Sequence, residues 1–190
     1  MTRMPRFAAK TITTNKGNYA FQRAFQFCTA MKKHSPLPDT NYTYGSNCAM
    51  GSYVFEGMFG LAGIEELVVP FSVVNSNCCA YIAYQCPNLK RVSFPNLEYV
   101  ASYGLQFVAY QCPQLKEASF PKLRYVDGEC FYRAFYNCSS LCDITWGTAN
   151  NIGGYDWVSG VSPTGTIRYS GDVTAVDTSH IPSGWRVVPA

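Results

Sequence analysis

Charged residues and histidines are scarce in this 190-residue chain, and long apolar runs are missing. Only 14% of the residues are Asp, Glu, Lys or Arg, and the formal net charge is +3. So small a charge does not favour a nucleic-acid partner on electrostatic grounds. No stretch approaches the roughly 20 apolar residues of a membrane-spanning helix. Arg3, Arg6 and Lys10 are not followed by the apolar segment of a secretory signal. We therefore expect no nucleic-acid partner, no membrane span and no export signal.

The chain also lacks the motifs of catalysis. Its two histidines, His34 and His180, have no nucleophile motif such as G-x-S-x-G beside them. The glycine-rich pieces NIGG and SPTG lack the Lys-Ser/Thr of a phosphate-binding loop, so they indicate turns. We expect no enzyme and no cofactor.

What the chain does contain is a tandem repeat. CPNLKRVSFPNLEYVASYGLQFVAYQ, from Cys86 to Gln111, is followed at once by CPQLKEASFPKLRYVDGECFYRAFYN, from Cys112 to Asn137. The two stretches are equally long; they agree in their apolar residues, proline and cysteine, and differ in their charged residues. This agreement indicates a structural repeat and not a catalytic motif.

Further copies extend the array in both directions. Alignment on the cysteine that begins each block adds Cys138 downstream and Leu61 and Cys28 upstream, which makes five copies. The spacing from Cys28 to Leu61 is longer than the spacing between any other two neighbouring copies. We therefore predict an insertion of about seven residues in a Pro- and Gly-containing loop near residues 34–51.

Each complete copy has three parts. The first, residues 89–95 in one copy, alternates near its end and predicts a short strand that the proline stops. The second, residues 97–100, predicts another short strand on a different side of the coil. The third part, of the type FYRAFYNC, spaces aromatic and small residues by one turn, which predicts a short helix or 3₁₀ turn.

Together the three parts predict one coil of an α/β solenoid, because a single coil cannot bury its apolar face without neighbours. We expect about five coils, each of about 25–26 residues, with short parallel strands over residues 18–146. Residues 1–17 are predicted to be an N-terminal cap and residues 147–190 a C-terminal cap. Within the second cap, residues 166–169 and 185–188 predict the strands of a hairpin.

Nine cysteines are many for a reducing compartment, and the number is odd. Four of them share one repeat position: Cys28, Cys86, Cys112 and Cys138. This periodicity favours small buried thiols that fill one column of the core, with disulfides as the alternative. A metal site is disfavoured because Cys78 and Cys79 are adjacent and only two histidines are present.

The repeats resemble the BspA-like leucine-rich repeats, a bacterial branch of the leucine-rich repeat superfamily. Units of that family read approximately L-x-x-I-x-I-P-x-x-V-x-x-I-x-x-x-A-F-x-x-C. Here L-x-x-V-x-F-P-x-L-x-x-V and R-A-F-Y-N-C-S-S-L match the unit, over about residues 18–146. The insertion in the first coil and the missing export signal depart from the family pattern. The resemblance implies a leucine-rich repeat array that serves as a binding surface on a bacterial cell or a phage particle.

We therefore expect a non-enzymatic binding module for adhesion or receptor recognition, with a protein or a glycan as the partner. The alternative is a structural protein of a phage virion or tail, in which the array is a spacer or an assembly surface and forms a homo-oligomer or joins the virion. Fold alone does not decide between these functions.

Two sets of residues are candidates for the binding surface. The first set varies between repeats and is expected to point outward in adjacent rows from the first strand: Glu65, Glu66, Lys90, Arg91, Ser93, Lys116, Glu117 and Ser119. Its charge changes along the array, which suits a specific partner; ordinary solvated charge is the alternative interpretation. The second set is aromatic and recurs once per coil: Tyr84, Tyr110 and Tyr136, preceded by Phe59, and a smaller column of Tyr99 and Tyr125. Exposed tyrosines would anchor a sugar ring, a protein or a second copy of the chain, whereas buried ones would be core.

Overall fold

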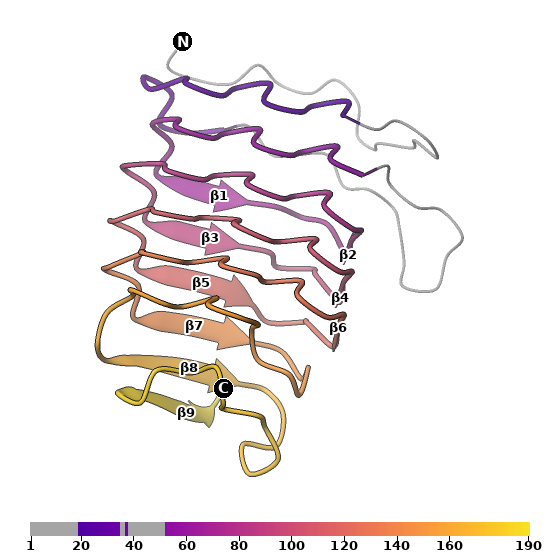
Figure 1. Ribbon diagram of the computed structural model, residues 1–190, viewed down its shortest axis with the longest axis vertical. Helices are drawn as coiled ribbons and strands as arrows, with labels where there is room; N and C mark the ends of the chain where they lie inside the picture. The colour runs from indigo at the N-terminus through magenta and orange to yellow at the C-terminus, as the bar shows by residue number, and fades with distance from the viewer. Residues whose placement is uncertain (1–18, 35–36, 38–51) are drawn as a thin grey trace.

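The protein is a parallel β-solenoid (Figure 1). Its structure is a computed structural model that describes residues 19–34, 37 and 52–190. Successive coils place one strand each in a six-stranded parallel sheet, in the order β1-β3-β5-β7-β8-β9. These strands are β1 (Glu66–Val68), β3 (Arg91–Ser93), β5 (Glu117–Phe120), β7 (Asp143–Trp146), β8 (Gly165–Tyr169) and β9 (Trp185–Pro189). A second, three-stranded parallel sheet contains β2 (Val73–Val74), β4 (Tyr99–Val100) and β6 (Tyr125–Val126). Both strands predicted for each repeat are therefore confirmed in the three coils that contain β1 to β6.

The strand registers show how the coils stack. Glu66 pairs with Arg91, Arg91 with Glu117 and Glu117 with Asp143, so each residue lies beside its equivalent in the next repeat. Asp143 then pairs with Thr166, which is a shorter step along the chain. The predicted spacing is thus confirmed for the central coils, and the coils shorten toward the C-terminal end.

The third part of each repeat is not helical, so the predicted α/β character is wrong for the described residues. Residues 19–27, 53–61, 77–85, 103–111 and 129–137 are runs of consecutive turns, which we call turn segments. In each segment every fourth residue has a positive φ, as at Asn77 (57°), Tyr81 (56°) and Gln85 (52°). No α-helix accommodates such residues, because right-handed helices require negative φ.

Backbone hydrogen bonds of two alternating kinds hold the turn segments. The N–H groups of Tyr81 and Ala83 donate to carbonyls of the next coil, at 3.0 and 2.9 Å. The intervening Ile82 N–H donates back along its own segment, to Cys79 O at 3.3 Å. Alternate N–H groups therefore bind the neighbouring coil, and the segment contributes its own ladder of hydrogen bonds to the stack.

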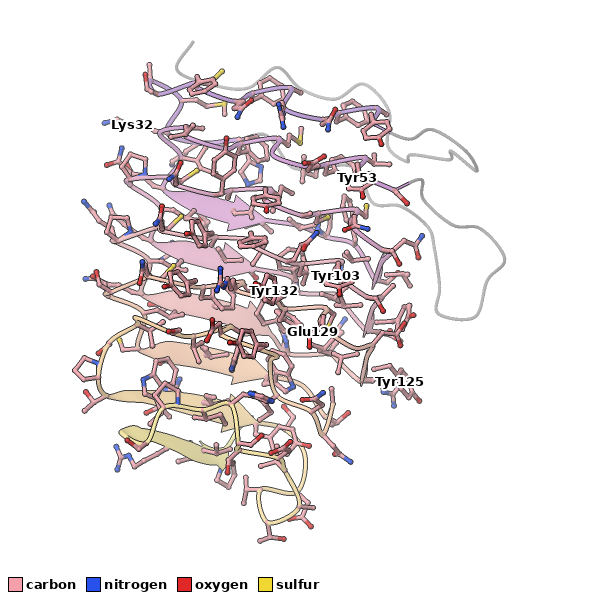
Figure 2. The ribbon with its side chains drawn as sticks, in the orientation of Figure 1. Lys32, Tyr53, Tyr103, Tyr125, Glu129 and Tyr132 are labelled. Atoms are coloured by element: carbon pink, nitrogen blue, oxygen red, sulfur yellow. The ribbon has the colours of Figure 1, made fainter. Side chains whose placement is uncertain are left out.

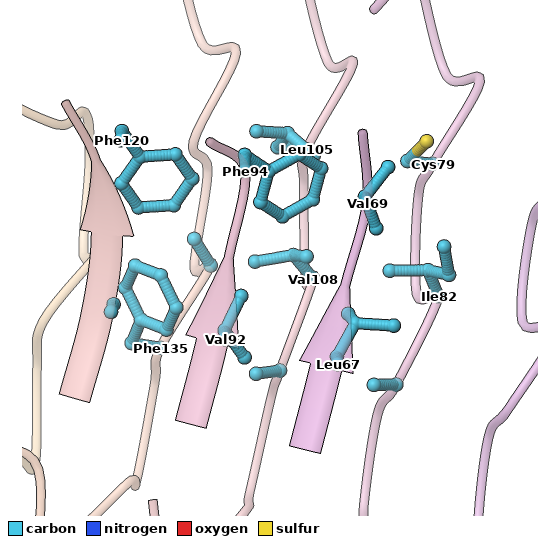
Figure 3. Packing of buried hydrophobic residues seen from close by; sticks show 14 of the residues in the cluster. Leu67, Val69, Cys79, Ile82, Val92, Phe94, Leu105, Val108, Phe120 and Phe135 are labelled. Carbon is cyan, nitrogen blue, oxygen red and sulfur yellow. The ribbon is translucent and has the colours of Figure 1, made fainter. Parts of the chain in front are cut away.

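The core lies between the sheet and the turn segments (Figure 3). Leu67 and Val69 of the β1 coil face Ile82 and Cys79 of the following turn segment, and all four side chains are fully buried. Val92, Phe94, Leu105 and Val108 repeat the arrangement in the next coil, and Phe120 and Phe135 are buried in the coil after it. Inward residues alternate along the strands, as expected for a sheet with one solvated face.

Turn segments bury residues with a period of four. In the segment 77–85, Cys78, Cys79, Ile82 and Ala83 are buried, and Tyr81 and Tyr84 are half-exposed. Two inward residues thus alternate with two outward positions, although the small side chain at one outward position, Ala80, is also buried. The same spacing of apolar residues occurs on one side of an α-helix, and this is why the sequence pattern suggested a helix.

The column of repeated cysteines is confirmed as core packing. Cys86, Cys112 and Cys138 are fully buried, and their Sγ atoms donate to carbonyl oxygens of the preceding coil at 3.0, 3.2 and 2.9 Å. Cys28 begins the same column and is half-buried. All the cysteines in the described part of the chain are free thiols.

The second coil is aligned one residue away from the predicted register. Leu61 N–H donates to Tyr84 O, just as Gln85 N–H donates to Tyr110 O, so Leu61 is equivalent to Gln85 and not to Cys86. Ala62, which is fully buried, takes the place of the cysteine. The sequence alignment placed Leu61 in the cysteine column because leucine is more typical of a core position than alanine is.

The predicted C-terminal hairpin is replaced by further coils. Both strands form, as β8 and β9, but they pair in parallel, with Ile167 opposite Val187. Residues 170–184 between them are long enough for a crossover, which parallel pairing requires and a hairpin does not. The predicted N-terminal cap (1–17) and most of the predicted insertion (34–51) lie outside the described residues.

Candidate functional site

The strand-face candidates lie in rows, as predicted. Glu66, Arg91 and Glu117 are in register on β1, β3 and β5, and Ser93 is in register with Ser119. Glu65, Lys90 and Lys116 directly precede these strands. We call the outward surface of the six-stranded sheet the strand face.

Much of the charge on the strand face is paired within the chain. Lys90 Nζ lies 3.1 Å from Glu65 Oε2, and Arg91 Nε lies 3.3 Å from Glu66 Oε1. The hydrogen bond from Lys90 and its positive charge hold the pKa of Glu65 below its ordinary value. Exposed pairs of this kind contribute little to stability because solvent screens them. Each of these two pairs joins a residue of one coil to a residue of the next coil. The strand face therefore has fewer unpaired charges with which to bind a partner.

The tyrosine column lies at the surface, half-buried, on the turn segments. Tyr110 and Tyr136 stack with ring centroids 5.5 Å apart and planes 12° apart. Tyr84 continues the column and accepts a hydrogen bond from Gln26 Nε2. Phe59 does not belong to it: Phe59 is fully buried, and Gly60 occupies the column position. A Cβ on Gly60 would come within 2.1 Å of the Tyr84 ring, so the glycine makes room for that ring.

Tyr99 and Tyr125 form the smaller column on β4 and β6, where they are paired in register. Tyr125 is 49% exposed. Tyr99 Oη donates to Asp127 Oδ2 at 2.5 Å. This column is therefore also on the surface, at the edge of the coil beside the turn segments.

The outward residues of the turn segments line up into ridges that run along the solenoid. We call their combined surface the turn face. Ridge one consists of residues 19, 52–53, 76–77, 102–103 and 128–129. Ridge two consists of residues 22–23, 56–57, 80–81, 106–107, 132–133 and 155–156, and ridge three of residues 26–27, 60–61, 84–85, 110–111, 136–137 and 159–160. The hydrogen bonds between successive segments fix this alignment.

Ridge two carries aromatic residues that the sequence reasoning missed. Tyr81 stacks on Phe107 at 4.5 Å, and Tyr132 stacks on Tyr155 at 6.1 Å. Tyr155 was hidden from the repeat alignment because its coil is shorter, although the aromatic residues of GYDW marked it. With ridge three, these rings make the turn face the more aromatic of the two outer surfaces.

Arg133 joins ridges two and three. Its guanidinium carbon lies 5.3 Å from the Tyr132 ring centroid and 5.2 Å from that of Tyr136, within the range of cation–π attraction. Nη2 of Arg133 lies 3.4 Å from Asp156 Oδ2. Its Nε is buried without a hydrogen-bond partner among the described residues. The ring faces and one carboxylate therefore hold this side chain.

Two grooves separate the ridges. Groove one, between ridges one and two, has a volume of about 470 Å³ and is lined by Tyr103, Gln106, Glu129, Tyr132 and Tyr155. Figure 2 shows Tyr103, Glu129 and Tyr132 close together on this part of the molecule.

Groove two, between ridges two and three, is filled along most of its length. The edge-to-face pair Phe107–Tyr110, at 5.4 Å, and Arg133 occupy it. It opens beside Gly57, where about 350 Å³ is lined by Arg23, Glu56, Tyr81 and Tyr84.

The two histidines lie in different settings, one packed against the core and one at the surface. Nε2 of His34 accepts a hydrogen bond from Val68 N–H at 3.0 Å, and its ring lies 5.1 Å from Phe59. His180 is exposed, and its carbonyl accepts a bond from Trp157 Nε1. In the described part of the chain no three His, Cys, Asp or Glu side chains come together to hold a metal ion. Nor do these residues include a helix long and apolar enough to cross a membrane.

Comparison of the chain with protein-family models, with curated proteins and with solved structures found no match.

Proposed function

We propose that the protein is a non-enzymatic recognition module whose partner, a protein or a glycan, contacts the turn face. The observation that carries this proposal is the aromatic surface of ridges two and three, held on a backbone that is hydrogen-bonded from coil to coil. Tyrosines are frequent in binding hot spots because each offers an apolar ring face and a polar tip at a small cost in side-chain entropy. A rigid array loses little further conformational freedom on binding.

The strand face is the weaker candidate within the same function. Lys90 and Arg91 already pair with glutamates of the neighbouring coil, so a partner would have to replace those contacts. We retain it as the matched comparison, because a double charge reversal there leaves the turn face untouched.

The family assignment stands as part of this proposal. The repeat unit L-x-x-V-x-F-P with its cysteine column resembles the BspA-like leucine-rich repeats, and the solenoid with one strand per coil in its larger sheet is compatible with it. A location on a bacterial cell surface or a phage particle follows from that resemblance alone.

Assembly into a larger structure is the second candidate, and one observation favours it. β9 is an edge strand of the six-stranded sheet, and edge strands pair readily with other chains. A structural role predicts a defined oligomer. Light scattering at high protein concentration that shows only a monomer would count against assembly and leave recognition in place.

The recognition proposal is tested by screening the wild-type protein on glycan and surface-protein arrays. Two variants are screened beside it: Tyr110→Ser with Tyr136→Ser on the turn face, and Lys90→Glu with Arg91→Glu on the strand face. We expect the turn-face variant to bind the partner found on the arrays at least about tenfold more weakly, since two interface aromatics are removed. The strand-face variant is expected to bind that partner with unchanged affinity. Retention of no partner, or loss only in the strand-face variant, would overturn the proposal. Circular dichroism and thermal unfolding confirm that both variants fold.

A further inference from the structure

Groove one is lined by aromatic rings and by one negatively charged side chain. That side chain takes part in no salt bridge among the described residues. The walls of the groove are Tyr103 on one side and Tyr132 with Tyr155 on the other. Tyr103 and Tyr155 are 43% and 56% exposed, so a bound group can reach their rings. Gln106 closes one end, since its Nε2 donates to Asn77 Oδ1 at 2.8 Å. Its volume of about 470 Å³ lies within the range of ligand pockets, about 300–1,000 Å³.

Glu129 supplies the charge. It is exposed, follows Tyr103 in ridge one by one coil, and is the only charged residue that lines the groove in the described part of the chain. None of the four salt bridges among the described residues includes it. The nearest cation of ridge two, Arg133, lies on the groove-two side of Tyr132, where it pairs with Asp156. Groove one is thus complementary to a positively charged group.

The protein itself shows which cation suits this combination. In groove two, the guanidinium of Arg133 lies over the rings of Tyr132 and Tyr136 and pairs with the carboxylate of Asp156. Groove one offers the same two kinds of group, tyrosine rings and the carboxylate of Glu129, and its described lining contributes no arginine. A guanidinium is also weakly hydrated and planar, so it stacks on aromatic rings, whereas a lysine ammonium is strongly hydrated.

We propose that groove one binds the guanidinium group of an arginine side chain presented by a partner protein. This inference rests on the proposed function, because it names the chemistry that the turn face recognises. The arginine stacks between the tyrosine walls and donates hydrogen bonds to the Glu129 carboxylate.

The test uses three capped peptides, Gly-Ser-Xaa-Ser-Gly, in which Xaa is arginine, lysine or citrulline. Citrulline is the neutral isostere of arginine. Each peptide is titrated into ¹⁵N-labelled full-length protein and followed by amide chemical shifts. We expect saturable shifts around Tyr103, Glu129 and Tyr132 with the arginine peptide, and binding weaker by about tenfold with the citrulline peptide, which cannot make the charge-assisted bond. The lysine peptide is expected to bind between these two.

A pair of isosteric variants controls for position. Glu129→Gln is expected to weaken the binding of the arginine peptide by about tenfold. Glu56→Gln removes a carboxylate from the lining of groove two, where Glu56 accepts a hydrogen bond from Gln22 at 2.6 Å, and is expected to leave binding of the peptide unchanged. Both changes are at half-exposed or exposed positions, so the fold is expected to survive them.

Several results would overturn the inference: equal binding of the citrulline peptide, an unchanged affinity in Glu129→Gln, or shifts confined to another surface. Tighter binding of tetramethylammonium chloride than of the arginine peptide would also overturn it, in favour of a quaternary ammonium ligand. If the arginine peptide fails while a partner found on the arrays is lost in Tyr110→Ser with Tyr136→Ser, the arginine inference is wrong and the recognition function stands. If the peptide binds groove one but the arrays retain nothing, the arginine inference stands without the wider function.

Discussion

Cys112 shows at the scale of one residue how stacking determines chemistry. Its Sγ donates to Ala83 O and accepts from Cys86 N–H, so the thiol is both buried and hydrogen-bonded. Burial raises the pKa of Cys112 well above its ordinary value, and the neighbouring thiols of Cys138 and Cys86 raise it further. A residue type often associated with reactivity is therefore kept in its unreactive form.

Alkylation of the native protein tests this assignment. We expect iodoacetamide to modify the exposed Cys142 within minutes and to leave Cys86, Cys112 and Cys138 unmodified until denaturant is added. Peptide mass spectrometry reads each site, and Cys142 serves as the internal control. Rapid labelling of Cys112 in the folded protein would show that the column is not core.

The pair of Glu65 and Lys90 gives a second prediction at this scale. Because the folded-state pKa of Glu65 is lowered, chiefly by the hydrogen bond from Lys90, the pair stabilises the fold at neutral pH. That contribution is lost as the pH falls through the lowered pKa. Lys90→Gln is expected to raise the pKa of Glu65 toward its ordinary value, as measured by the side-chain carboxyl ¹³C shift. An unchanged titration would show that the contact is not formed in solution.

At the scale of the element, the strands could be predicted from the sequence and the conformation of the turn segments could not. The strands were predictable because Leu, Val and Phe alternate and a proline follows, as at Val92, Phe94 and Pro95. A helix was predicted for the third part because two-in, two-out burial has nearly the period of a helix. The difference lies in φ, and glycine marks it at Gly57 but not at Tyr103, Phe107 and Gln111, which all adopt positive φ. Such non-glycine residues recur throughout the turn segments, at a cost that the hydrogen bonds between coils offset.

Substitution of Asn137 distinguishes turns from a helix. Asn137 is exposed with φ of 57°, so Asn137→Gly is expected to be neutral or stabilising, and Asn137→Val to cost about 1–2 kcal/mol more than glycine. In a helix the order would reverse, because glycine is there the worse residue. Urea unfolding of the two variants measures the order. A more stable Asn137→Val protein would contradict the turn assignment.

At the scale of the whole molecule, two long surfaces result from one repeating unit. The repeat length was predictable because Leu, Pro and Cys recur in the same columns, from Leu89 to Leu115. The surfaces were only partly predictable. The rows of Lys90 and Arg91 could be placed by counting from the strand, but their glutamate partners depend on the register between neighbouring coils. The grooves of the turn face depend on the positive φ values, so the sequence did not reveal them.

The C-terminal coils illustrate the same limit. β8 and β9 could be located from their apolar residues, but their parallel pairing depends on the route of residues 170–184. Trp146 and Trp157 pack at 5.6 Å in the core of these shorter coils, where large rings fill the space. The C-terminal coils differ in sequence from the other repeats, so an alignment by residue type does not detect them.

Hydroxyl-radical footprinting of the wild-type protein, with and without a partner identified on the arrays, tests the central claim most directly. It reads the solvent access of individual side chains by mass spectrometry and needs no mutation. We expect protection of the ridge-two and ridge-three rings Tyr110, Tyr132 and Tyr136, with unchanged oxidation of side chains on the strand face. Protection of the strand face around Val68, with Tyr110, Tyr132 and Tyr136 still oxidised, would contradict the assignment of the turn face as the recognition surface.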